Sequence, residues 1–212
     1  MKIVCYGDSN TWGHNPVNGK RFNEKERWPK ILQEKLGNEY EIIEEGLCGR
    51  TAAFVDDIKP FRYGLGMLEG IIETHMPSDL IIIMLGTNDL KSNFSPNAVA
   101  ISNGIRKMVQ QIRDIYRWSK YEYEPKILIL SPIYLGETIS TIDRTFEQFG
   151  QEGLDLSKKL AKYYKQVADN FDCYFMDASE YAQASNIDCI HMDSTNHEKL
   201  ACALYDFMKE EF

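Results

Sequence analysis

The sequence predicts an α/β fold in which a parallel sheet of about five strands lies between two layers of helices. Several short aliphatic segments have the continuous apolar character of strands that are covered on both faces. Segments with helical patterns separate them. Alternation of strand and helix implies parallel strands joined by right-handed crossovers. We therefore expect a three-layer α/β/α sandwich.

Four segments rich in β-branched and aliphatic residues are the expected strands, and a weaker fifth follows Phe171-Asp172. They are residues 2–6, 39–44, 79–85, 126–130 and 173–176. In open parallel sheets, ligands bind outside the carboxyl ends of the strands. Functional residues are therefore expected directly after these segments.

Four helices are expected between and after the strands. Residues 28–36 begin at Trp28-Pro29 and stop at Gly37, a C-terminal stop signal. A second helix follows Ser95-Pro96, with Ser95 as its cap and Pro96 in its first turn. The others are residues 154–167 and residues 198–208, whose apolar side chains share one face.

Composition and charge exclude several classes of protein. The chain has 212 residues and a formal net charge of −8, which argues against nucleic acid as the main partner because phosphate binding needs clustered cations. The longest apolar run, residues 80–85, is too short to span a membrane, and no leader-like segment begins the sequence. Five cysteines without a CxxC pair favour reduced thiols and a cytoplasmic location. No repeat or linker divides residues 1–212, so one domain is expected.

Three polar clusters hold the residues that suggest chemistry. Residues 7–13 follow the first strand, residues 86–89 follow the third, and residues 188–191 stand near the end of the sequence. A serine becomes a good nucleophile only when a base removes its proton, and that base works best when a third group fixes its tautomer. Asp188 and His191 are three residues apart, so one turn can join carboxylate to imidazole and leave the second ring nitrogen for Ser9.

These clusters resemble, in order, the conserved blocks of the SGNH, or GDSL-type, hydrolases. The resemblance rests on Gly7-Asp8-Ser9, on the glycines of residues 45–51, on Gly86-Thr87-Asn88-Asp89 and on Asp188-x-x-His191. It covers nearly the whole chain, and it is nearest to the small oligomeric arylesterase and acyltransferase branch. The family has a flavodoxin-like α/β sandwich, which agrees with the fold predicted above.

The resemblance implies a role for each matched residue. Ser9 is the implied nucleophile, His191 the general base and Asp188 the acid that orients it. The backbone N–H groups of Ser9 and Gly49, with the Asn88 amide, are the implied oxyanion donors. Two positions depart from the family pattern: Asn10 replaces the leucine of the GDSL string, and Cys189 replaces a glycine.

Other polar residues have simpler interpretations. Asp8 and Asp89 are expected to brace turns, Arg50 to form a structural salt bridge, and His14 to line the site mouth without acting as the base. His75 and His197 are expected at helix ends. The residues expected to contact the substrate are Asn10, Trp12, Thr87 and Ile190.

Motifs for other chemistries fail. The serine is not in a G-x-S-x-G elbow, the glycines of residues 64–70 miss the dinucleotide spacing, and His197-Glu198 lacks a second histidine at the zincin position. We expect no metal and no cofactor.

The predicted function is hydrolysis of short-chain, acetyl-type carboxylic esters, with water or an alcohol as acyl acceptor. Alternatives are a carbohydrate O-deacetylase, a lysophospholipase or thioesterase, and a non-catalytic α/β binding module. The long segment of residues 131–153 is expected to cover the substrate channel and to contribute to a homo-oligomer.

Overall fold

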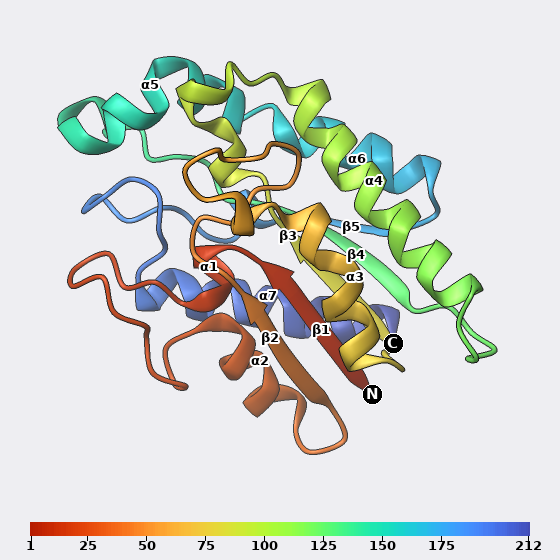
Figure 1. Ribbon diagram of the computed structural model, residues 1–212. Helices are drawn as coiled ribbons and strands as arrows, with labels where there is room; N and C mark the ends of the chain where they lie inside the picture. The colour runs from red at the N-terminus through yellow and green to blue at the C-terminus, as the bar shows by residue number, and fades with distance from the viewer.

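The computed structural model describes residues 1–212 and contains one five-stranded sheet in which every strand pair is parallel (Figure 1). The strands lie in the order β2-β1-β3-β4-β5. Their bounds are β1 Lys2–Gly7, β2 Glu41–Gly46, β3 Leu80–Met84, β4 Lys126–Ser131 and β5 Tyr174–Asp177. All five expected strands are present, with ends that differ from the expected ones by at most two residues.

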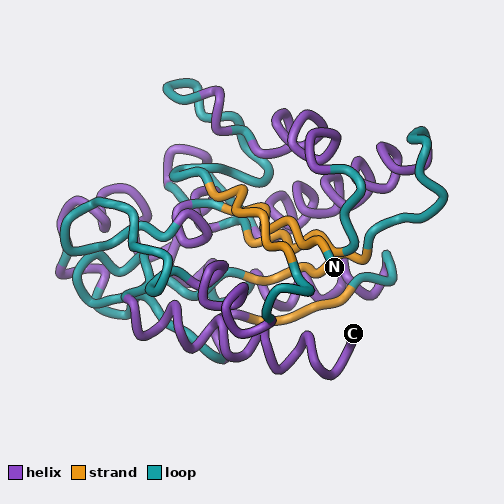
Figure 2. Tube along the Cα trace, turned by 90° about the horizontal axis from the view of Figure 1, so that it is seen from below, coloured by secondary structure: helices purple, strands orange, loops and turns teal.

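Helices cover both faces of the sheet, and Figure 2 shows the strands between them. The helices are α1 Ser9–Trp12, α2 Trp28–Leu36, α3 Gly64–His75, α4 Ala98–Arg117, α5 Asp143–Ser157, α6 Leu160–Asn170 and α7 Ser194–Glu211. Helices α3, α4 and α6 pack on one face, and α2 and α7 on the other. The three-layer α/β/α sandwich predicted from the sequence is confirmed.

Neighbouring residues of β1 show why the strands read as continuous apolar runs. Val4 and Tyr6 belong to the core under α3 and α4, whereas Ile3 and Cys5 belong to the core under α2 and α7. Successive side chains of a strand point to opposite faces. Because both faces are buried, no polar alternation remains.

Two helix predictions need correction, as does the expectation of a long loop over residues 131–153. The helix after Ser95-Pro96 is capped by Asn97, whose Oδ1 accepts a hydrogen bond from Ala100 N at 2.8 Å, while Ser95 adopts a left-handed φ of 44°. The helix expected over residues 154–167 is two helices, because α5 ends at Ser157 and α6 begins at Leu160. The segment 131–153 is partly helical, since α5 begins at Asp143.

Helix α3 was not predicted at all. Its glycines at positions 64, 66 and 70 are poor helix formers, and they obscured the apolar positions of the helix. Gly64 is nonetheless required, because a Cβ there would lie 2.5 Å from the Thr51 carbonyl oxygen. None of the helices has both the length and the apolar character needed to cross a membrane.

His197, in the first turn of α7, is fully buried beneath α2. Its Nδ1 accepts a hydrogen bond of 3.4 Å from the Trp28 backbone N–H, and its ring meets Phe22 edge-on. Burial lowers the pKa of His197 from 6.5 to about 3. The unfolded chain therefore binds a proton that the folded chain does not bind between these two pH values.

This difference predicts a specific acid sensitivity. The stabilisation from neutral His197 is complete above pH 6.5 and declines as the pH falls toward 3, by about 1.4 kcal/mol per pH unit at most. We expect the unfolding free energy from urea titrations to fall more steeply between pH 6.5 and 4.5 in the native protein than in His197→Asn. Parallel pH profiles would show that this histidine does not contribute.

Candidate active site

The polar clusters of the sequence meet at the carboxyl edge of the sheet. Residues 8–13 leave the end of β1, and the segment around Asn88 leaves the end of β3, which pairs with β1. The third cluster belongs to the loop of residues 185–193, between β5 and α7. The parallel sheet thus places segments that are distant in sequence side by side.

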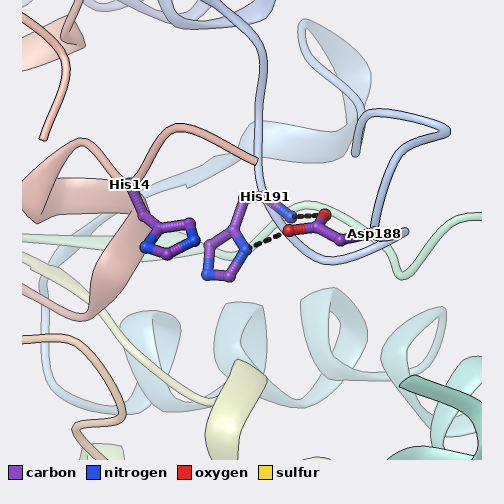
Figure 3. A group of neighbouring side chains, drawn as sticks. All are labelled: His14, Asp188 and His191. Atoms are coloured by element: carbon purple, nitrogen blue, oxygen red, sulfur yellow. Dashed lines mark hydrogen bonds and ion pairs between the residues drawn. The ribbon is translucent and has the colours of Figure 1, made fainter. Parts of the chain in front are cut away.

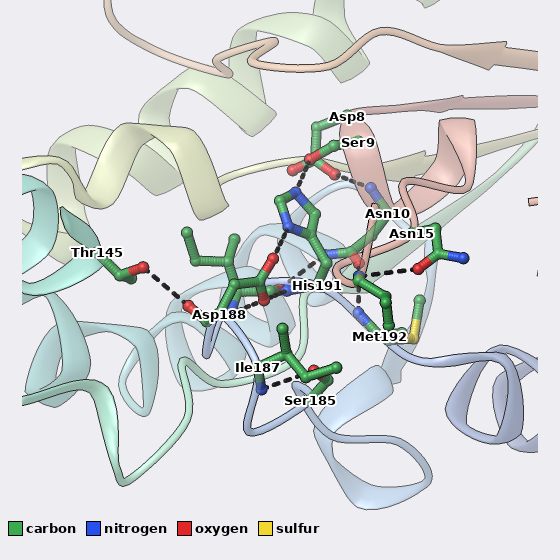
Figure 4. A network of polar contacts seen from close by, with 12 residues as sticks. Asp8, Ser9, Asn10, Asn15, Thr145, Ser185, Ile187, Asp188, His191 and Met192 are labelled. Atoms are coloured by element: carbon green, nitrogen blue, oxygen red, sulfur yellow. Dashed lines mark hydrogen bonds and ion pairs between the residues drawn. The ribbon is translucent and has the colours of Figure 1, made fainter. Parts of the chain in front are cut away.

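Ser9, His191 and Asp188 form a continuous hydrogen-bonded chain (Figure 4). The Ser9 Oγ lies 2.9 Å from His191 Nε2, and His191 Nδ1 lies 2.6 Å from Asp188 Oδ2. Ser9 is 5% exposed, and the His191 and Asp188 side chains are partly buried. This arrangement can move a proton from the serine hydroxyl to the imidazole.

Asp188 is fixed as an ion that faces the imidazole. Its Oδ1 accepts the backbone N–H groups of Ile190 at 3.0 Å and His191 at 2.9 Å, so only Oδ2 is left for the ring. Burial opposes ionisation of the carboxyl, but the hydrogen bond and the charge interaction with His191 outweigh it and lower the pKa of Asp188. The neutral histidine therefore keeps its proton on Nδ1 and offers Nε2 to Ser9.

The three donors expected for an oxyanion, Ser9 N–H, Gly49 N–H and the Asn88 amide, belong to three separate segments. The backbone N–H groups of Ser9 and Gly49 donate to no other protein group, and the Asn88 amide uses one hydrogen to reach Arg50 O at 3.2 Å. Gly49 has a φ of 84°, and a Cβ there would lie 2.5 Å from the Arg62 guanidinium. The positive φ favours glycine at that position, whereas the flexible Arg62 side chain could move away from a Cβ.

The loop that carries Gly49 is held by two buried charged residues. Asp89 accepts the backbone N–H groups of Ala52 and Ala53, both at 2.7 Å, and of Phe54 at 3.2 Å. Arg50 donates to Gly7 O at 2.8 Å and to Glu45 O, and its guanidinium lies 4.1 Å from the Tyr6 ring centroid. The bracing role expected for Asp89 is confirmed. The salt bridge expected for Arg50 is wrong, because backbone carbonyls and an aromatic ring take its place.

Asp8 braces the turn that holds the serine. It is buried, and its Oδ1 accepts the Asn10 backbone N–H at 2.9 Å. Burial raises the pKa of Asp8, a shift that its hydrogen bond to Asn10 opposes. The side chain therefore acts on the backbone around Ser9, as expected for a turn residue.

The residues expected to contact the substrate have different surroundings. Asn10 does not fit that prediction, because its amide binds the backbone of the loop that carries His191. Thr87 is buried, and Ile190 packs against the core cluster that includes β1 and α4 residues. Trp12 is half-buried, with the Arg21 guanidinium 5.6 Å from its ring.

His14 lies beside the His191 imidazole, as Figure 3 shows. Its ring centroid is 4.1 Å from that of His191, and the two planes are tilted by 34°. Burial lowers the pKa of His14, and the neighbouring His191 lowers it further. His14, Asp188 and His191 are also a group with potential metal-ligand atoms, which lie within 4.8 Å of one another. Both ring nitrogens of His191 are already engaged, one by Asp188 and one by Ser9, so a metal ion on His191 would have to displace one of these bonds.

His75 makes a contact that the sequence did not reveal. It ends α3, and its Nε2 lies 2.7 Å from Glu45 Oε1 on β2. The helix-end position is as expected, but the side chain binds a carboxylate.

The chain is similar to a known protein family and to several solved structures. A family model described as GDSL-like lipase/acylhydrolase matches residues 5–197. A carbohydrate acetylesterase family member from Sinorhizobium meliloti is 35% identical with a TM-score of 0.92, and the match covers 99% of this chain and 98% of that one. The aryl esterase of M. smegmatis is 32% identical with a TM-score of 0.90 over all of both chains. A lipase/acylhydrolase from Enterococcus faecalis, 16% identical with a TM-score of 0.71, shares the fold over 99% of this chain and 96% of that one. Among curated protein sequences, none matches.

Proposed function

The chain belongs to the GDSL-like lipase/acylhydrolase family, and from that premise we propose that it cleaves short-chain carboxylic esters through an acyl-enzyme on Ser9. The hydrogen-bonded chain from Ser9 through His191 to Asp188 is the observation that carries the proposal. One similar structure bears the name of a carbohydrate acetylesterase, which supports an acetyl-type acyl group, and another bears the name of an aryl esterase, which supports ester cleavage.

The proposed reaction has two halves. Ser9 Oγ attacks the ester carbonyl while His191 Nε2 takes the hydroxyl proton, and the Ser9, Gly49 and Asn88 donors hold the negative oxygen. The alcohol leaves with the proton from His191. Water then attacks the acyl carbon and gives its proton to His191, which returns it to Ser9 as the carboxylic acid departs.

A panel of esters tests the substrate class. We expect turnover of p-nitrophenyl acetate to exceed that of the butyrate and of the octanoate. The same panel compares acetylated sugars, aryl acetates and acetyl-CoA. A preference for acetylated sugars would indicate the O-deacetylase, the second candidate, which the similarity to a carbohydrate acetylesterase favours. Equal rates along the acyl series would contradict the short-chain proposal.

Removal of one oxyanion donor is expected to slow the chemistry without weakening binding. We expect Asn88→Ala to lower kcat for p-nitrophenyl acetate about 10²- to 10³-fold, while KM stays within a few-fold. The reason is that the Asn88 amide forms a stronger hydrogen bond with the carbonyl oxygen once that oxygen is negatively charged. Asn93→Ala, which changes an exposed asparagine in a nearby turn, is the matched control. An unchanged kcat in Asn88→Ala would remove Asn88 from the proposed oxyanion site.

We also propose acyl transfer to alcohols, a homo-oligomer that involves residues 131–153, and one domain spanning residues 1–212 in the cytoplasm. Transfer is supported by the resemblance to the acyltransferase branch, and added alcohol must then yield a new ester alongside the acid.

The oligomer is supported by exposed Phe146 in that segment, and light scattering must then show more than one chain. Five unpaired cysteines support the cytoplasm.

A further inference from the structure

Asn10 joins the turn that carries the serine to the loop that carries the histidine. Its Nδ2 donates to Ile190 O at 3.2 Å, and its Oδ1 accepts the Met192 N–H at 3.0 Å. The amide therefore binds the backbone on both sides of His191 (Figure 4). The side chain is only 2% exposed. Both polar atoms of this buried side chain therefore bind the protein backbone.

The far end of the histidine loop is held by other elements. Gly136 N donates to Cys189 O at 2.8 Å, and the Thr145 hydroxyl donates to Asp188 O at 3.0 Å. These bonds fix the Asp188 end of the loop against the segment after β4 and against α5. Neither bond joins the loop to residues 8–13.

Across the gap between residues 8–13 and residues 185–193, only three hydrogen bonds pass. Two belong to the Asn10 amide, and the third is the Ser9–His191 bond itself. That third bond is lost when Ser9 Oγ becomes acylated, because the oxygen then has no proton to donate. In the acyl-enzyme, the Asn10 amide alone provides hydrogen bonds between the two segments.

We propose that Asn10 is a positioning residue that keeps His191 in place during deacylation. The inference rests on the acyl-enzyme mechanism proposed above and adds a residue to it. During acylation, the Ser9–His191 bond helps to align the imidazole. During deacylation, His191 must hold a water molecule against the acyl carbon without that bond, so its position depends on Asn10.

The test is Asn10→Leu, which keeps the branch at Cγ and removes both polar atoms. With p-nitrophenyl acetate we expect kcat to fall about 10- to 100-fold, because small displacements of catalytic groups have effects of this size. The fall in kcat/KM should be smaller, because it reports acylation. A burst of p-nitrophenolate that approaches one equivalent per active site should precede the slow steady state.

Asn15→Leu is the matched control, because the Asn15 side chain only accepts the Val17 N–H within its own exposed turn. We expect this control to keep the native kcat and to show the native burst. A folded Asn10→Leu protein with native kcat, or one in which kcat and kcat/KM fall equally without a burst, would overturn the proposal.

Asn10→Asp decides the question if the leucine variant does not fold. Aspartate has the shape of asparagine and still accepts the Met192 N–H, but it cannot donate to Ile190 O. We expect the same burst with a slower steady state, and an acid limb of the kcat/KM profile that moves to higher pH, because an added anion favours the protonated imidazole. A native burst and a native pH profile in this variant would overturn the proposal.

Labelling of Ser9 separates failure of this inference from failure of the function. An organophosphate that modifies Ser9 in the native protein upholds the acyl-enzyme mechanism whatever the Asn10 variants show. Native behaviour of the Asn10 variants alongside such labelling would contradict the role of Asn10 alone.

Discussion

Ser9→Ala is expected to lower kcat for p-nitrophenyl acetate by about 10⁴- to 10⁶-fold. The alanine removes the only atom that the proposed mechanism joins to the acyl group. The remaining donors still bind the carbonyl oxygen, so a small residual rate over water is expected. Steady-state assays near pH 8 with purified protein measure both rates.

Two controls accompany this measurement. Circular dichroism must show the same fold in Ser9→Ala, because the loss has to be chemical. Ser119→Ala changes a hydroxyl that binds Tyr116 O beyond the end of α4, and it should keep the native rate. A Ser9→Ala protein that is as active as the native one would require another nucleophile.

His191→Gln is expected to lower kcat by a similar factor, about 10⁴-fold or more. Glutamine can still hydrogen-bond to Ser9, but it cannot take up the hydroxyl proton or return it to the leaving alcohol. The acid limb of the pH–rate profile should also disappear, because that limb reports ionisation of the essential base.

His14→Gln tells which of the two adjacent imidazoles is the base. The His14 ring lies 4.1 Å from that of His191, but the ring bonded to both Ser9 and Asp188 is that of His191. We expect His14→Gln to keep its acid limb and to lose less than about tenfold in kcat, in contrast to the effect of losing a triad member. The reverse pattern would exchange the roles of the two histidines.

The sequence predicted those parts of the fold that depend on local pattern and burial. Its aliphatic runs indicated strands covered on both faces, because Ile3 and Val4 pack into opposite cores. Helix α3 escaped prediction because its three glycines weaken the helical signal, although Gly64 is needed for the close approach of the helix to Thr51 O.

The meeting of Ser9 and His191 was expected chiefly from the resemblance to the SGNH hydrolases. The shared edge of parallel strand ends accounts for Ser9 and Asn88, and the Asp188-x-x-His191 spacing allows a single turn to pair those two side chains. The link made by Asn10 was not predictable, because its partners lie 180 and 182 residues away and are backbone atoms. No residue type at positions 190 and 192 signals that contact.

The loop that carries His191 adds a second feature hidden from the sequence. Cys189 adopts a left-handed φ of 60°, a conformation that glycine tolerates best, and its side chain is fully buried. Its sulfur packs where a Cβ on Gly136 would lie 2.8 Å away. The close packing of this sulfur against Gly136 is a contact that only the folded structure reveals.

The most direct test of the central claim is to locate the covalent adduct formed by diethyl p-nitrophenyl phosphate. The mechanism predicts one diethylphosphoryl group per chain, on the peptide that contains Ser9, with loss of esterase activity in the same proportion. The adduct should be absent from Ser9→Ala. An adduct on another residue, or full esterase activity in a protein phosphorylated at Ser9, would contradict the account.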